Sequence, residues 1–390
     1  MKKNFLFLTA AMLVACAVSC KKTAEASFQA PEAEKTKGRI TVNIGIPEEK
    51  TKALANSDNV KDFRINSVQL FVFDNQGGGA DGSEPMETDY YYAPASPASN
   101  SVNVTMNTTS GRKIIYAVVN RARMTCDPDV GFTTGDFEEL LVDLQENSFT
   151  GLVMAGKNEI DVEPFDRNAN PDQTAQEMDL CVRRLVAMVK LSAVTVDFSQ
   201  TSLAGSGFKI TGLYLKNAVG RARMGLDGNT ADTGTDGSVS FLPLSSAQYA
   251  NGNYWYNKMK MVSGCPVVLT DSNFNVPCTT AGTATAIGRC LFTFPNATDT
   301  DSTSSTWSAR RTRLIVKASV TGEDSSVDTY YTFTLPPLES NKVYNIQNIH
   351  ITQMGKADDN TDTVLSGGQI TPTVTVDDWD SEVINLSYEF

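Results

Sequence analysis

The sequence has few of the residues on which most catalytic, metal-binding and nucleic-acid-binding sites depend. Its 390 residues include one histidine, His350. A zinc site with several histidines is therefore excluded, and a Ser-His-Asp triad would have to use His350. Lys and Arg number 33 against 45 Asp and Glu, which gives a net charge of -12. Contacts to nucleic-acid phosphates need clustered cations, so we expect no nucleic-acid partner. No recognisable acid-base, nucleophile or metal-ligand arrangement stands out in the sequence, so we also expect no catalytic residues, no metal and no cofactor.

Cysteines are also sparse, and long apolar runs are missing beyond the N-terminus. None of the seven cysteines stands in a CxxC motif, so a structural zinc or redox site is not expected. Cys265 and Cys278 flank a hairpin-like loop, so they could either form a disulfide bond or remain as free thiols. The apolar run Phe5–Val18 follows Lys2 and Lys3 and is too short to span a membrane. It predicts a signal peptide over residues 1–19.

The signal ends in two cysteines preceded by small residues, the pattern of a bacterial lipid-attachment site. Cys20 gives the more usual signal length and is followed directly by charged residues, so we predict lipidation there. Cys16, which has a leucine three positions before it, is the alternative. Residues 20–38 lack an apolar period and predict a flexible tether between the lipid anchor at a membrane surface and the rest of the chain.

From residue 39 onward, apolar and polar residues alternate in many short segments separated by turn sequences. This pattern predicts an all-β protein with two tandem β-sandwiches, over residues 39–182 and 183–390. One segment differs, because Phe137, Leu140, Leu141 and Leu144 recur at helical spacing. It predicts one short helix over Asp136–Glu146.

The two ends of the predicted sandwiches have matching patterns. The first strand carries Ile40, Val42, Ile44 and Ile46 at every second position, and the last carries Ile384, Leu386, Tyr388 and Phe390. A lysine-containing segment follows the first strand and is a plausible protease target. Cutting there would free the strand and open a groove for the last strand of a second copy, a head-to-tail contact that builds filaments. The alternative is that both strands stay in their own sheets.

The aromatic residues Tyr254, Trp255 and Tyr256 form a second candidate site. Exposed aromatic rings can stack on sugars, which suggests a surface glycan-binding lipoprotein. Packing of these rings against the sandwich is the simpler interpretation.

Several motifs together resemble the fimbrillin family, the FimA-like lipoprotein subunits of type V pili in Gram-negative gut and oral bacteria. No single motif is specific, but their order and spacing are. They are the lipid-attachment site at Cys20, the strand Arg39–Ile46 followed by Thr51–Leu54, and the segments Val68–Asp74, Ile114–Asn120, Gly151–Gly156, Arg183–Leu191, Asn341–Ile346 and Val374–Trp379.

The resemblance implies transthyretin-like Greek-key sandwiches and a structural, non-enzymatic role in a surface fimbria involved in adhesion. It places a proteolytic cut between Lys52 and Ala53, so that residues 39–52 are the removable first strand and cleavage loop. It makes residues from about 371 to 390 the donor strand. The best-known family members have arginine before the cut, whereas this chain has Lys52, and an uncut subunit would serve as an anchor or tip.

The implied partners follow from this role. They are other copies of the chain and related pilus subunits, a maturation protease, the outer membrane through the lipid anchor, and a host or microbial surface receptor. The implied location is the outer membrane and the extracellular fimbrium.

Overall fold

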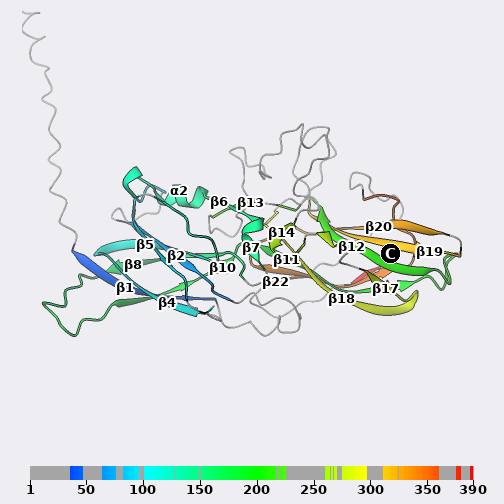
Figure 1. Cartoon of the computed structure of the whole chain (residues 1–390), viewed down its shortest axis with the longest axis horizontal. Coiled ribbons are helices and arrows are strands. Elements are labelled where there is room, and N and C mark those ends of the chain that lie inside the picture. The colour runs from blue at the N-terminus through cyan, green and yellow to red at the C-terminus, as the bar shows by residue number, and fades with distance from the viewer. Residues whose placement is uncertain are drawn as a thin grey trace, which may run out of the picture. The chain divides into compact units, whose positions relative to one another are not determined.

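The computed structural model describes the chain mainly from residue 36 onward, as a β-rich unit (Figure 1). Lys37–Phe390 form one compact unit. The described residues are 36–46, 64–75, 82–94, 96, 101–126, 128–148, 151–216, 218–219, 221–224, 260–263, 265–266, 268–269, 275–296, 311–323, 325–359, 375–378 and 387–389.

The N-terminal sandwich is made of a three-stranded and a five-stranded sheet. The strand orders are β4-β1-β9 and β10-β8-β5-β2-β3. Side chains from both sheets form one apolar core between them. The strands are β1 (Lys37–Gly45), β2 (Val68–Asp74), β3 (Met86–Tyr92), β4 (Ser101–Thr109), β5 (Gly111–Val119), β8 (Met154–Val162), β9 (Gln176–Cys181) and β10 (Arg183–Arg184).

The β2 strand is buried on both faces, which explains its unbroken apolar sequence. Val68, Leu70 and Val72 belong to the core between the two sheets. Phe71 and Phe73 belong to a second core on the opposite face. Period-two alternation is lost in such a strand because neither face meets water.

The second core lies under α2 (Thr134–Glu139), which ends earlier than the sequence predicts. Thr133 and Asp136 form a capping box at its start. Leu140 then takes an extended conformation, and β6 (Leu141–Asp143) pairs with β13 (Arg221–Arg223). The prediction of one helix over Asp136–Glu146 was therefore wrong for Leu140–Asp143, because strand pairing overrides the helical spacing there, while Leu144–Glu146 form a short 3-10 helix.

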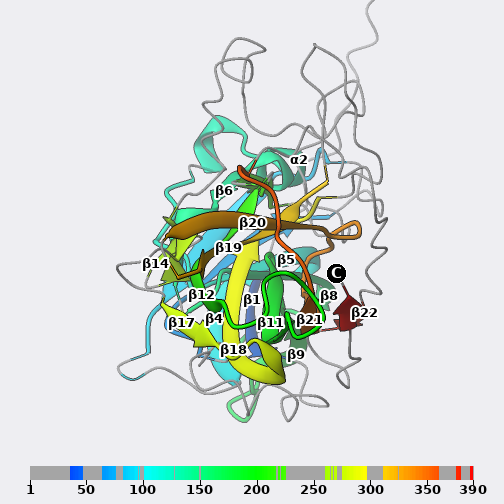
Figure 2. The same ribbon diagram turned by 90° about the vertical axis from the view of Figure 1, so that its right-hand side faces the viewer.

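The C-terminal sandwich, which faces the viewer in Figure 2, also consists of two sheets. One sheet has the order β18-β11-β21-β22, with β23 also paired to β21, and the other has β16-β12-β19-β20, with β17 paired to β12. The strands are β11 (Ala187–Asp197), β12 (Gly207–Lys216), β16 (Val268–Leu269), β17 (Val276–Cys278), β18 (Ala281–Thr293), β19 (Arg313–Thr321), β20 (Ser326–Thr334), β21 (Lys342–Ile351), β22 (Thr375–Asp378) and β23 (Ser387–Glu389).

Strands from the two halves of the chain also pair with one another. Besides the β6–β13 pair, β7 (Asn147–Ser148) pairs with β14 (Lys260–Ser263), which pairs with β15 (Cys265–Pro266). The buried Arg184 backbone N–H and side chain both donate to Asn341 Oδ1 at 3.3 Å. The all-β prediction is confirmed, whereas the predicted domain limits stay a prediction.

Replacing Phe137 with alanine tests the importance of α2 for the second core. The ring is fully buried, with its centroid 4.4 Å from that of Tyr116 and 5.0 Å from that of Phe71. We expect Phe137→Ala to lower the free energy of unfolding by about 3–5 kcal/mol in urea denaturation. Val130→Ala is the control, because Val130 is 76% exposed. An equally small decrease in the free energy of unfolding in both variants would contradict the packing of Phe137 in this core.

Candidate functional site

The β1 strand is central in its sheet, although it lies near the start of the chain. It pairs antiparallel with β4 from Lys37 to Gly45 and parallel with β9 from Ile40 to Gly45. Figure 1 shows β1 among the strands of the N-terminal sandwich. We call the position of β1 between β4 and β9 the β1 slot. Emptying the slot would leave unpaired backbone groups along both of its walls.

The inward face of β1 supplies apolar side chains to the core. Ile40, Val42 and Ile44 are 0% exposed, and Ile46, directly after the strand, is 3% exposed. They pack in the same core as Val68, Leu70 and Ile115 of the facing sheet. Losing β1 would expose this apolar floor to water, so an empty slot favours a replacement strand with alternating apolar residues.

The outward face of β1 is held by polar contacts to both neighbouring strands. Thr41 Oγ1 lies 2.9 Å from Thr105 Oγ1 of β4, and Asn43 Nδ2 donates to Asp179 Oδ1 of β9 at 3.0 Å. At Gly38, a Cβ atom would stand only 2.5 Å from Val162 Cγ1. This end of the slot therefore requires a glycine or a shift of Val162.

The walls of the slot have attachments that do not involve β1. On one side, Asn158 Nδ2 of β8 donates to the Asp179 carbonyl of β9 at 2.8 Å, and Gln176 Nε2 donates to the Asp161 carbonyl at 2.9 Å. On the other side, β4 continues through Ser110 into β5, and the Thr109 backbone N–H donates to Glu87 at 2.7 Å. Both walls thus remain tied to the five-stranded sheet if β1 leaves.

The C-terminal segment lies on the edge of its own sheet in this structure. β22 runs antiparallel to β21 at Lys342–Asn345, whereas β23 runs parallel to it at Asn348–His350. The described part of residues 371–390 forms two short strands of opposite direction, and the role of this segment as a donor strand stays a prediction.

Not all of the predicted site residues fall within the described part of the chain. Tyr388 lies in β23, where its backbone is opposite Ile349. His350 lies in β21, between β11 and β23. Cys278 carries a free thiol, so it forms no disulfide with Cys265. The predicted residues outside the described ranges are Cys16, Cys20, Lys52, Ala53, Tyr254, Trp255, Tyr256, Ile384, Leu386 and Phe390.

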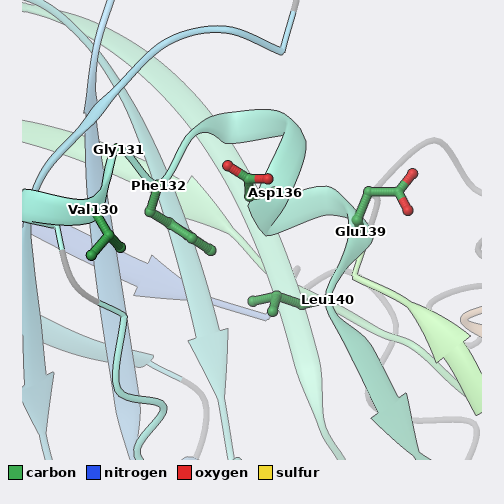
Figure 3. Close-up of a pocket in the computed structure, with 6 residues that line it drawn as sticks. All are labelled: Val130, Gly131, Phe132, Asp136, Glu139 and Leu140. Carbon is green, nitrogen blue, oxygen red and sulfur yellow. The ribbon is translucent and has the colours of Figure 1, made fainter.

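A shallow depression beside α2 is a further candidate site, with a volume of about 480 Å³. Figure 3 shows Phe132 and Leu140 lining it, while the Glu139 carboxylate points away from them. No cluster of metal-binding side chains occurs among the residues that the structure describes. The depression lacks converging polar groups, and we assign it no function.

No helix in the described ranges is long and apolar enough to cross a membrane.

Comparisons with known proteins support a fimbrial interpretation. Residues 38–162, which contain the β1 slot, match the family model described as major fimbrial subunit protein (FimA). The resemblance to fimbrillins is thereby confirmed. No curated protein sequence matches the chain.

Solved structures share the fold of the chain at low sequence identity. A fimbrilin from Porphyromonas gingivalis is 12% identical with a TM-score of 0.51, over 90% of this chain and 97% of its own. A protein from Bacteroides eggerthii, provisionally described as a cell adhesion protein, is 14% identical with a TM-score of 0.54, over 90% of this chain and 98% of its own. A protein from Parabacteroides distasonis with the same provisional description is 16% identical with a TM-score of 0.52, over 89% of this chain and 98% of its own.

Replacing Val42 with aspartate tests whether β1 holds the slot together. The change puts an unpaired charge in the core and is expected to detach β1 at a cost of several kcal/mol. We expect faster amide hydrogen exchange in β4 and β9, measured by mass spectrometry. Asn43→Ala is the comparison, because it removes only one outward hydrogen bond to β9 and leaves the apolar face intact, so it should raise the exchange far less. Unchanged exchange in β4 and β9 of Val42→Asp would contradict the role of β1.

Proposed function

We propose, from the match of residues 38–162 to the major fimbrial subunit family, that the chain is a structural subunit of a bacterial surface fimbria involved in adhesion. It has no catalytic role in this proposal. The observation that carries the proposal is the central position of β1, whose loss opens backbone and apolar contacts together. The subunit polymerises by filling the β1 slot with a strand from another copy.

Maturation makes β1 removable. The subunit is exported as a lipoprotein on Cys20 and cut between Lys52 and Ala53. The cut separates β1 from all later strands, so that only noncovalent contacts hold it in the slot. Once the link is broken, β1 no longer benefits from the high effective concentration of a covalently attached strand, and a competitor can displace it.

The C-terminal segment of a second copy is the proposed competitor. Ile384, Leu386, Tyr388 and Phe390 repeat the period-two apolar pattern of the strand they replace. In its own copy, the described parts of the C-terminal segment, β22 and β23, pair with one edge of β21. A segment that leaves a sheet edge loses strand pairing on one side, whereas a segment that enters the β1 slot gains strand pairing on two sides. Because the contact is head-to-tail, each added subunit offers the same contact to the next, and a filament grows.

Limited digestion tests the cut and the exchange together. We expect trypsin to cut protein lacking residues 1–20 after Lys52, to give a core that begins at Ala53 and a ladder of multimers on an unboiled denaturing gel. A variant that also lacks residues 381–390 is the control, and it should be cut but form no ladder. A monomeric core that keeps β1 would contradict the proposal and indicate an anchor or tip subunit.

Single substitutions in the donor segment test its register. Leu386→Asp would place an unpaired charge on the face that enters the slot, which should weaken assembly by several kcal/mol. Asn385→Asp puts the same charge on the opposite face and should assemble far better. Equal filament yields from the two variants, measured by sedimentation, would count against Leu386 facing the slot.

A further inference from the structure

A buried ammonium group lies between two carboxylates at one end of the N-terminal sandwich. The Lys113 side chain is 0% exposed, and its Nζ is 3.0 Å from Asp74 Oδ1 and 2.6 Å from Glu87 Oε2. The side chains of Asp74 and Glu87 are 8% and 17% exposed. The pair Arg112–Glu159, on strands β5 and β8, is a contrast, because its side chains are 50% and 43% exposed.

Strand register brings these three groups together. Lys113 of β5 stands directly opposite Asp74 of β2. Glu87 lies on β3, which pairs with the other edge of β2. Three adjacent strands therefore hold the lysine amine 3.0 Å from an oxygen of the Asp74 carboxylate, with the second carboxylate 2.6 Å from the same amine.

Burial makes this ion pair expensive to keep. Removing an ammonium and a carboxylate from water costs free energy that their attraction only partly returns. Condensation of the pair to an amide removes both charges. A site that excludes water also favours the amide, because water is a product of the condensation.

We propose that Lys113 and Asp74 are joined by an intramolecular isopeptide bond that forms once the sandwich has folded. Glu87 relays one proton from the Lys113 ammonium to the Asp74 carboxylate, and the neutral amine attacks Cγ of the resulting carboxylic acid. A new bond forms between Nζ and Cγ. The protons lost from nitrogen pass to the departing Asp74 oxygen, which leaves as water. One ammonium and one carboxylate thus give one amide and one water molecule, with no other reactant.

The hydrogen bonds around Glu87 suit a group that passes on a proton and is a carboxylate again after the reaction. Its carboxylate accepts hydrogen bonds from the Thr108 hydroxyl at 2.7 Å, the Thr109 backbone N–H at 2.7 Å and the Thr109 hydroxyl at 2.8 Å. Burial acts to raise the pKa of Glu87, but the hydrogen bonds and charge of its neighbours hold that pKa below its usual value. The carboxylate is therefore ionised at neutral pH, and its three other donors still satisfy it once the ammonium is consumed.

The bond would brace the sheet that forms the floor of the β1 slot. It would link β2 to β5 covalently, at the end where β4 turns into β5. A cross-link there would keep the floor intact while β1 is absent from the slot. This property goes beyond the proposed assembly mechanism and does not depend on it.

Mass spectrometry of the full-length folded protein tests the bond directly. We expect the protein to be lighter than its sequence mass by one water molecule, and a tryptic digest to contain a branched peptide joining Lys113 to Asp74. The Lys113→Met variant should show no such loss. Linear peptides carrying unmodified Lys113 and Asp74, or a water loss located elsewhere, would overturn the proposal.

Two glutamate variants test the proton carrier. Glu87→Gln should leave the Lys113–Asp74 bond unformed, with the fold checked by circular dichroism. Glu159→Gln, which removes the exposed partner of Arg112, should keep the bond. A Glu87→Gln protein that is fully cross-linked would overturn the role of Glu87. The measurement on the unaltered protein decides on the bond itself even if a variant does not fold.

Discussion

Pairing of β1 on both of its edges is the constraint on which the N-terminal sandwich depends. Strands at a chain terminus can be lost cheaply from a sheet edge, but β1 lies between β4 and β9. Its removal would unpair two strands and expose the apolar floor beneath it. The sheet therefore needs an occupant in the β1 slot, and this need gives the proposed assembly both its driving force and its register.

The opposite end of the chain has the complementary arrangement. β22 and β23 cover the edge of β21, and they pair with it on one side through a few residues each. A segment held in this way is easier to detach than a central strand. The free energy needed to detach this segment is small compared with the free energy gained from the contacts in the β1 slot. Proteolysis, and not detachment of the C-terminal segment, is therefore the controlling step in this account.

Much of the fold could be predicted from the sequence, because alternation reports burial on one face. Ile40 to Ile46 show the pattern, and all four of their apolar members are buried. The short extent of α2 could not be predicted, since β6 leaves the helix to pair with β13, more than seventy residues later in the chain. The cluster around Lys113 was missed for a similar reason. Lys113, Asp74 and Glu87 meet through strand register, and nothing local in the sequence marks them.

The most direct test of the central claim is displacement of β1 by the proposed donor. A synthetic peptide of residues Ser381–Phe390 would be added to subunits cut after Lys52, and the fragment that contains β1 would be followed by size-exclusion chromatography with mass spectrometry. The account predicts that the peptide binds and the β1 fragment is released, whereas a peptide with Leu386 replaced by aspartate does neither. Retention of the β1 fragment at saturating peptide, with no peptide bound, would contradict the account.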